Sequence, residues 1–254
     1  MEASPIRAPG RLLGQEQLAA AKTRFATRDA IGSWWRAKSE AHSAERARRS
    51  LNVVAAALLL VATLPLMLLI AVCIKLSSRG PVLYAQDRIG LDRRNGTQPE
   101  SPGRRQRDLG GRPFTMLKFR TMTYSPSDDD QVWATPDDPR VTPIGRVLRQ
   151  LRMDELPQLV NVLKGDMNLV GPRPEQPDIF HLLREGIDRY AERQLVRPGI
   201  TGWAQVNQPY DLSFSDVERK LQYDLDYIHQ RSTGFDLQII LRTIPVVLTR
   251  FGAW

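Results

Sequence analysis

An uncharged apolar run of 24 residues, from Leu51 to Ile74, constrains this chain more than any other feature. A continuous helix over the run would be about 36 Å long, enough to cross the hydrocarbon core of a bilayer. The run begins too far from the N-terminus, and lacks the small-residue cleavage site, to be a signal peptide. A buried core helix is the alternative, but uncharged runs of this length are typical of membranes. The run therefore predicts a membrane-inserted helix.

Two features of this run argue against a simple span. Pro65 lies in its middle, where proline removes a backbone hydrogen bond and kinks a helix. The two halves would be only about 21 and 15 Å long, each too short to cross alone. The basic flanks are also symmetric, although asymmetric flanks orient a spanning helix. They comprise residues 36, 38, 46, 48 and 49 before the run and residues 75, 79, 88, 93 and 94 after it. We therefore predict that residues 51–76 form a re-entrant helical hairpin kinked at Pro65.

Despite this run, the composition of the 254-residue chain as a whole is that of a mostly soluble basic protein. The mean hydropathy is −0.35, the formal net charge is +8 and the pI is about 10.0. Such charge favours an anionic partner, whether nucleic acid, phospholipid head groups or phosphorylated metabolites. The single cysteine, Cys73, excludes an internal disulfide, and the three scattered histidines exclude a zinc site of ordinary spacing. The sequence has neither a P-loop nor a G-x-G-x-x-G motif.

The remaining segments predict an α-rich fold with few short strands. We expect residues 1–50 to be a flexible basic extension, residues 82–84 to begin a strand, and residues 114–122 to form another. Alternation on the second strand places Lys118 and Arg120 on one face. Residues 91–112 should form a mobile basic loop. The run at residues 128–130 mimics a D-x-D metal motif, but without an apolar frame it is better explained as a solvated loop.

Three helices are expected in the C-terminal part, over residues 180–195, 215–228 and 235–251. The last carries an apolar stripe, and two placements remain open for it. The helix could pack on the core, or it could lie in the membrane interface with its arginines toward head groups. The stripe consists of Leu237, Ile240, Leu241, Ile244, Val247 and Leu248.

Residues 149–174 carry the most informative polar pattern. The spacing of apolar residues predicts a helix over 155–164, with Asp154 as its N-cap and Gly165 at its C-terminus. Two carboxylates would then lie at the positive end of a helix dipole, near arginines 149, 152 and 173. Prolines on both sides of Arg173 would stiffen a loop suited to phosphate. From the pattern alone, Asp154 is either only a cap or a catalytic carboxylate beside an anion site.

Several ordered motifs resemble those of the bacterial sugar transferase family, the monotopic polyprenyl-phosphate phosphoglycosyl transferases. The resemblance covers residues 51 to 254 and is closest to the small, single-domain members. It implies a monotopic membrane protein with a re-entrant helix, a compact catalytic domain over 77–254 and interfacial amphipathic helices. The motifs are the apolar helix with its central proline, GPVLYAQDRIG, F-x-x-LKFRTM, DPRVTPIGRVLRQLRMDELPQLVNVLKGDMNLVGPRPE and VRPGITGWAQVN.

The resemblance also implies residue roles. Asp154 would be the nucleophile and Glu155 the second member of a catalytic dyad, with Asp154 also the expected ligand of Mg²⁺. Asp154 would attack the β-phosphate of a UDP-sugar, expel UMP and pass the sugar phosphate to a polyprenyl phosphate. Phosphate or nucleotide contacts are expected from Lys118, Arg120, Arg149, Arg173 and Arg197.

The resemblance places the protein at the cytoplasmic face of the bacterial inner membrane. Its expected partners are a UDP-sugar, polyprenyl phosphate and membrane lipid, without nucleic acid, and a homo-oligomer is left open. The competing hypothesis is a polybasic, membrane-attached protein that binds anionic lipid or nucleic acid and needs no special carboxylate. The sequence does not identify the sugar or the glycan.

Overall fold

The computed structural model describes residues 15–92, 110–123, 138–208 and 214–249, with side chains from residue 43 onward. The chain divides into two compact units, residues 1–48 and residues 49–254. The loop predicted at 91–112 and the acidic run at 128–130 lie wholly or mostly outside the described residues. The second unit holds every predicted site residue.

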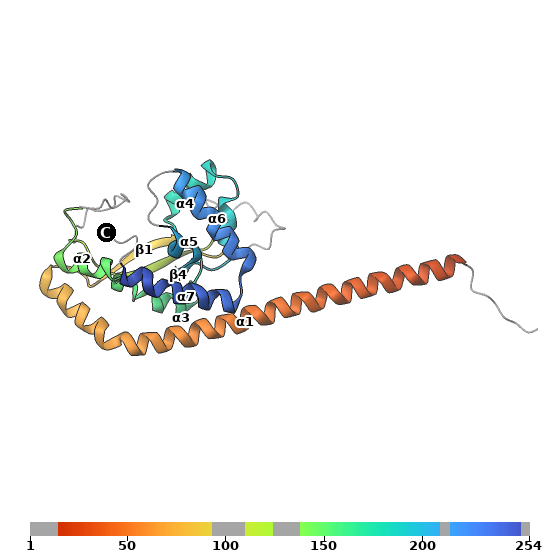
Figure 1. The fold of residues 1–254 in the computed structure, drawn as a ribbon, viewed down its shortest axis with the longest axis horizontal. Helices are drawn as coiled ribbons and strands as arrows, with labels where there is room; N and C mark the ends of the chain where they lie inside the picture. The colour runs from red at the N-terminus through yellow and green to blue at the C-terminus, as the bar shows by residue number, and fades with distance from the viewer. Residues whose placement is uncertain (1–14, 93–109, 124–137, 209–213, 250–254) are drawn as a thin grey trace, which may run out of the picture. The chain divides into compact units, whose positions relative to one another are not determined.

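Helix predominates among the described residues, and the strands are few and short, which confirms the predicted class (Figure 1). Strands β1 (Leu83–Ile89) and β2 (Pro113–Phe119) form an antiparallel pair. Strands β3 (Asn168–Val170) and β4 (Gly199–Thr201) form a parallel pair. The helices are α1 (Gln15–Ser77), α2 (Pro143–Gln150), α3 (Gln158–Lys164), α4 (Pro177–Gly186), α5 (Trp203–Asn207), α6 (Phe214–Gln230) and α7 (Thr233–Leu248), with 3₁₀ turns η1 (Met153–Glu155) and η2 (Tyr190–Leu195).

Helix α1 begins at Gln15, so residues 15–50 are helical where the sequence predicted a flexible extension. This segment is rich in Ala, Gln, Glu, Lys and Arg, all of which have high helix propensity. Residues 1–14 lie outside the described residues. Because residues 15–50 have no apolar period, the sequence pattern did not indicate this helix.

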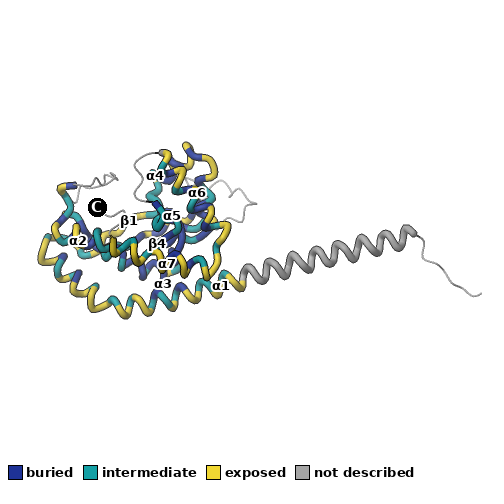
Figure 2. Tube along the Cα trace, viewed as in Figure 1, coloured by how far each residue is buried: buried dark blue, intermediate teal, exposed yellow. Residues whose placement is uncertain are grey.

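The apolar run forms the C-terminal part of α1, which continues through Pro65 and bends in its last turns (Figure 1). Residues Ser43–Ser77 are long and apolar enough to cross a membrane, and only 11 % of their most apolar window is buried (Figure 2). The buried stripe includes Ile70 and Ile74, which pack on Phe119 and Leu148. A helix with this much exposed apolar surface is suited to a membrane. The re-entrant hairpin at 51–76 stays a prediction.

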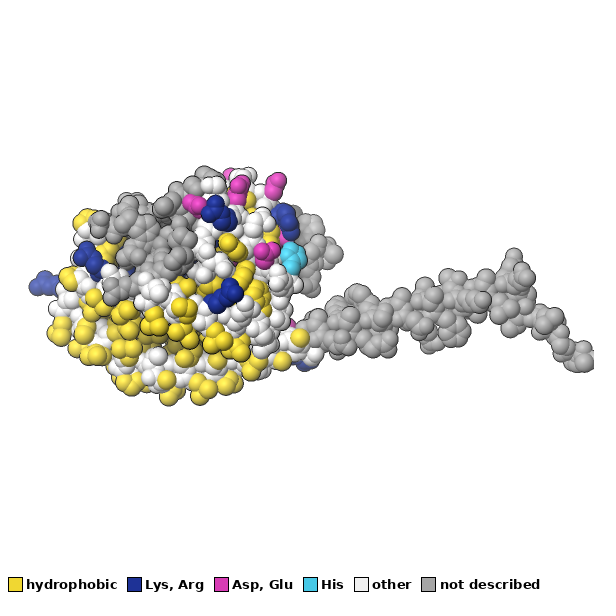
Figure 3. All heavy atoms as spheres, in the orientation of Figure 1, with side chains coloured by type: hydrophobic (Ala, Val, Ile, Leu, Met, Phe, Trp, Pro, Cys, Tyr) yellow, Lys and Arg dark blue, Asp and Glu magenta, His cyan; other side chains and the backbone are white. Residues whose placement is uncertain are grey.

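Helix α7 exposes the apolar stripe that the sequence identified. Leu237, Leu241 and Ile244 are each more than half exposed, whereas Ile239, which lies off the stripe, is buried. Figure 3 shows hydrophobic side chains gathered on the face that carries α7 and the apolar part of α1. Most of the stripe is therefore not buried on the core, and the interfacial placement stays a prediction.

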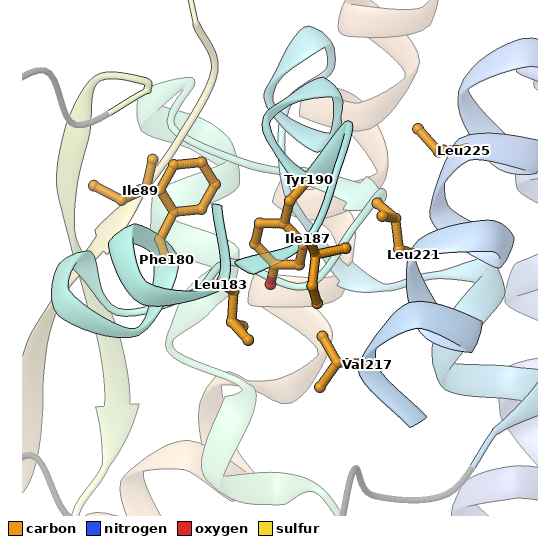
Figure 4. Packing of buried hydrophobic residues seen from close by; sticks show 8 residues of the cluster. All are labelled: Ile89, Phe180, Leu183, Ile187, Tyr190, Val217, Leu221 and Leu225. Carbon is orange, nitrogen blue, oxygen red and sulfur yellow. The ribbon is translucent and has the colours of Figure 1, made fainter. Parts of the chain in front are cut away.

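The helices around the second half of the chain enclose a separate hydrophobic cluster (Figure 4). The expected helix at 180–195 is divided into α4 and η2, because the chain turns after Gly186. Its side chains meet those of α6, and the cluster consists of Ile89, Phe180, Leu183, Ile187, Tyr190, Val217, Leu221 and Leu225. This cluster packs α4, η2 and α6 against one another.

Candidate active site

The two adjacent carboxylates lie in η1, directly before α3. Arg152 precedes them in the left-handed conformation, with φ 55°, and Pro157 stands at the start of α3. The predicted N-cap role of Asp154 is therefore wrong. Proline lacks an N–H and suits the start of a helix. Helix α3 therefore begins directly after Pro157 and not at Glu155. The predicted C-terminus is confirmed, since Gly165 adopts φ 93° after Lys164.

The buried side chain of Asn161 hydrogen-bonds helix α3 to strand β2. The Asn161 amide donates to the carbonyl of Thr115 at 2.8 Å, and its oxygen accepts from the Leu117 amide at 3.0 Å. Asn161 thus replaces a missing strand neighbour of β2. Because Lys118 follows Leu117, this pairing fixes the lysine opposite the turn that carries the carboxylates.

Glu155 is the better-paired carboxylate of the two. Its Oε1 accepts from the Arg173 guanidinium at 2.8 Å and lies 3.3 Å from Lys118 Nζ. Burial alone would raise the pKa of Glu155, but the Arg173 and Lys118 charges outweigh it and hold that pKa well below its usual range. Glu155 is therefore ionised at neutral pH. We call Asp154, Glu155, Lys118 and Arg173 the Glu155 cluster.

Asp154 is buried but poorly paired. Among the described residues no donor lies within hydrogen-bond distance of its carboxylate, and Lys118 Nζ is 4.0 Å away. Burial and the neighbouring Glu155 charge raise the pKa of Asp154, although Lys118 acts in the opposite direction. Its charge is thus destabilised in the folded protein, which increases its tendency to accept a proton or an electrophile.

Arg149 is a further cation that acts on Asp154. Its Nε donates to Thr121 Oγ1 at 2.9 Å, and its positive charge acts on Asp154. Gly145 makes this placement possible, because a Cβ there would lie 1.9 Å from the Thr121 carbonyl oxygen. A residue without a side chain lets α2 pack directly on the chain that follows β2.

Two predicted phosphate contacts have partners elsewhere. The buried Arg120 donates to the carbonyl and hydroxyl of Ser78, both at 2.9 Å, and to the carbonyl of Arg79, so it binds the C-terminal end of α1. Arg197 donates to the Gly165 carbonyl at 3.2 Å, at the C-terminal end of α3. The structure therefore brings Lys118 and Arg173 to the carboxylates and Arg149 close to them. It gives Arg120 and Arg197 contacts with helix ends.

One further cation near the site, Arg88, was not among the predicted site residues. The register of β1 with β2 places Arg88 opposite Phe114 and Tyr84 opposite Lys118, so Arg88 and Lys118 share a sheet face. Burial lowers the pKa of Arg88 to about 10, and its charge acts on Lys118 and Glu155. Alternation within GPVLYAQDRIG could have indicated this face, but only the strand pairing brings it to the site.

The donor set fits a Mg²⁺ ion that is bound together with a phosphorylated substrate. The described residues contain no group of three or more His, Cys, Asp or Glu side chains that could hold a metal. Mg²⁺ commonly takes one or two protein carboxylates and completes its shell with water and substrate phosphates. Asp154, whose oxygens accept from no donor in the described part of the chain, is the carboxylate that could hold such an ion.

Comparison with known proteins gives consistent matches. The family model described as bacterial sugar transferase matches residues 43–250. The chain is 41 % identical over 206 residues to a UDP-N-acetylgalactosamine-undecaprenyl-phosphate N-acetylgalactosaminephosphotransferase of Aeromonas hydrophila, covering 81 % of this chain and 44 % of that protein. It is 43 % identical over 209 residues to a UDP-glucose:undecaprenyl-phosphate glucose-1-phosphate transferase of Caulobacter vibrioides, covering 82 % and 72 %. For the Escherichia coli protein of the same name the identity is 38 % over 199 residues, covering 78 % and 39 %. The chain thus spans less than half of two of these three relatives.

Proposed function

The chain belongs to the bacterial sugar transferase family, and from this premise we propose that it transfers a sugar-1-phosphate from a UDP-sugar to a polyprenyl phosphate such as undecaprenyl phosphate. UMP is the second product. The reaction would be the first membrane step in the synthesis of a surface polysaccharide or glycoconjugate. The relatives' names support both substrate classes, since they combine UDP-sugars with undecaprenyl phosphate.

The observation that carries the proposal is the contrast between the two adjacent carboxylates. Glu155 is paired with Lys118 and Arg173, whereas Asp154 has no hydrogen-bond donor among the described residues and a raised pKa. A nucleophile needs an accessible lone pair, and an orienting group needs fixed partners. Asp154 therefore has the properties of the nucleophile, and Glu155 those of the residue that holds the two cations in place.

The proposed reaction has two steps. In the first, an Asp154 oxygen attacks the β-phosphorus of the UDP-sugar. The bond from that phosphorus to the bridging oxygen breaks, and UMP leaves with the bonding electron pair. In the second, an oxygen of the polyprenyl phosphate attacks the same phosphorus, so that the Asp154 carboxylate is released and polyprenyl-diphospho-sugar is formed. Both steps invert at phosphorus, and the carboxylate is regenerated.

The main barrier is repulsion between a carboxylate and a diphosphate, which cationic groups reduce. Lys118 and Arg173 lie beside Asp154 and can pair with phosphate oxygens once the substrate competes with Glu155 for them. Mg²⁺, when bound at Asp154 with the diphosphate, would supply further neutralisation of the phosphate oxygens. Arg149, whose charge also acts on Asp154, would add positive charge for the incoming phosphate.

The exposed apolar surfaces support a membrane location for this chemistry. A polyprenyl chain is confined to the bilayer, whereas a UDP-sugar is dissolved in the cytoplasm. Helix α1 and the exposed stripe of α7 would hold the domain at the cytoplasmic face of the inner membrane, with 51–76 as the re-entrant segment. Basic side chains add attraction to anionic lipid of about 1 kcal/mol each near the surface.

The proposal is tested with purified full-length chain, undecaprenyl phosphate and a panel of UDP-sugars. We expect UMP release from at least one UDP-sugar only when Mg²⁺ is present. Asp154→Asn should abolish release while vesicle binding stays unchanged, and rapid quench of the wild type should reveal a sugar-phosphate mass on the Asp154 peptide. No UMP from any donor would favour the polybasic lipid-binding alternative. UMP release without the adduct would favour direct transfer.

A further inference from the structure

The loop that carries Arg173 is held by its main-chain carbonyls. Four consecutive carbonyls, from Pro172 to Glu175, each accept a hydrogen bond from a group outside the loop. The donors are the Gly199 amide to Pro172 at 3.0 Å, Arg193 Nη2 to Arg173 at 3.0 Å, Arg88 Nη1 to Pro174 at 3.1 Å and the Ile89 amide to Glu175 at 2.9 Å. Prolines on both sides of Arg173 fix φ as well. The loop therefore has little freedom at the residue that reaches Glu155.

The Arg193 side chain donates a hydrogen bond to the main chain of Arg173 itself. It is 2 % exposed, and each of its three guanidinium nitrogens donates a hydrogen bond, which together fix the plane of the group. Nε donates to Asp224 Oδ2 at 2.7 Å, Nη1 donates to the Tyr190 hydroxyl at 2.6 Å, and Nη2 donates to the Arg173 carbonyl. Because a guanidinium group is planar and rigid, two fixed partners determine where its third nitrogen donates.

The anchors of Arg193 are themselves rigid. Asp224 lies on α6, and the Tyr190 ring lies inside the hydrophobic cluster shown in Figure 4. Glu175, two residues after Arg173, lies 3.5 Å from Arg193 Nη1 and accepts from Lys220 of α6 at 3.0 Å. We call Glu175, Arg193, Asp224 and Lys220 the Glu175 cluster. It ties the Arg173 loop to α6 at two points.

We propose that Arg193 is a positioning residue for the transfer reaction, which holds the main chain of Arg173 so that its guanidinium meets the substrate phosphate beside Asp154. The inference rests on the proposed function, but it concerns a residue that contacts neither Asp154 nor Glu155 among the described residues. Arg193 acts through Arg173. Misplacement of a catalytic group by about 1 Å can reduce a rate by about 100-fold.

The alternative is that Arg193 only stabilises the fold. Both roles predict a lower melting temperature after substitution, so stability does not separate them. They differ in their coupling to Arg173. A positioning residue loses its effect on catalysis once the guanidinium that it positions has been removed, whereas a purely structural residue keeps its effect.

The test is a double-mutant cycle with Arg193→Lys, Arg173→Ala and the double variant, using kcat/KM for UMP release. Lysine keeps the charge opposite Asp224 but cannot reach three partners from one plane. We expect Arg193→Lys alone to lower kcat/KM about 10- to 100-fold, and to change it less than about twofold in the Arg173→Ala background. Arg189→Lys is the matched control, since Arg189 lies in the same region but pairs with Glu192 at the surface. Equal losses in both backgrounds would overturn the inference.

Hydrogen exchange gives a second measurement that needs no activity. The Ile89 and Gly199 amides donate to the loop, so their exchange reports its order. We expect faster exchange at these amides in Arg193→Lys and unchanged exchange in α2. Asp224→Asn, which removes the charged anchor, should give the same pattern if Arg193→Lys does not fold. Unchanged exchange at Ile89 and Gly199 would overturn the inference even in an active enzyme. A wild type that releases no UMP would instead refute the proposed function, and exchange would still decide whether Arg193 holds the loop.

Discussion

The Glu155 cluster and the Glu175 cluster contain the same kinds of group, two carboxylates, one lysine and one arginine. In both, a glutamate pairs with both cations, at 3.3 and 2.8 Å for Glu155 and at 3.0 and 3.5 Å for Glu175. The difference lies in the second carboxylate. Asp224 accepts from Arg193 at 2.7 Å, whereas Asp154 has no donor among the described residues.

We propose that this difference separates a structural charge cluster from a reactive one. The two arginines also differ in exposure, with Arg173 at 25 % and Arg193 at 1 %, whereas Lys118 and Lys220 are similar at 17 % and 15 %. A substrate can therefore compete for Arg173 more readily than for Arg193. Charge composition alone would not distinguish the two clusters. A fully paired buried network stabilises the fold, whereas a partly paired one leaves a destabilised charge, as is common at functional sites.

The largest expected effect is the loss of stability in Glu175→Gln. Burial alone would raise the pKa of Glu175, but Lys220 and Arg193 lower it from 4.5 to about 2. A carboxylate whose pKa is lower in the folded state stabilises the fold above its unfolded pKa, and this contribution disappears as the pH falls from 4.5 to about 2. We expect Glu175→Gln to lower the free energy of unfolding by roughly 3 kcal/mol at pH 7, and to remove this acid dependence. Chemical unfolding of the detergent-solubilised chain at several pH values measures both.

Glu192→Gln provides the matched control for that measurement. Glu192 pairs with Arg189 through two hydrogen bonds of 2.7 and 2.9 Å, but the pair lies at the surface. Surface pairs contribute about 0 to 1 kcal/mol. If Glu175→Gln destabilised no more than Glu192→Gln, the Glu175 cluster would not be the stabilising member of the comparison.

The next largest effect is expected on activity in Glu155→Gln. An amide cannot balance the charges of Lys118 and Arg173, so both cations lose the group that orients them. We expect kcat/KM to fall about 10- to 100-fold. Glu185→Gln is the control, because Glu185 is exposed and its partner is the surface residue His181. Activity within twofold of the wild type in Glu155→Gln would show that the pairing has no role in positioning.

Local sequence patterns predicted what depends on local physics. Turn and capping chemistry predicted Gly165, apolar spacing predicted α6, and alternation predicted β2. Lys118 and Arg173 came from the family resemblance, and the structure brings both to Glu155. The stripe on α7 was visible as a period, but only the structure shows that it faces outward.

Contacts between distant segments could not be predicted. Arg120 shares the motif of Lys118, yet it bonds carbonyls 41 and 42 residues away. Arg193 and Asp224 are 31 residues apart, and no local pattern marks either. The N-cap error at Asp154 has a local cause, since Pro157 was present in the sequence but its preference for a helix start was outweighed by the carboxylate pattern.

The smallest effect, and the one of opposite sign, is expected for the stability of Asp154→Asn. Burial and the Glu155 charge raise the pKa of Asp154. The protonated carboxyl group therefore stabilises the folded state, and the charged carboxylate destabilises it. This contribution to stability is lost as the pH rises through the folded pKa. The neutral asparagine should therefore leave the melting temperature at pH 7 equal to or above that of the wild type. Asp138→Asn is the contrasting variant, because a hydrogen bond from Arg140 lowers the pKa of Asp138 to about 2, and its charge therefore stabilises the fold. Asp138→Asn should lower the melting temperature. A decrease of the same size in Asp154→Asn would mean that Asp154 is as well paired as Asp138, and the contrast that supports its proposed role as nucleophile would fail.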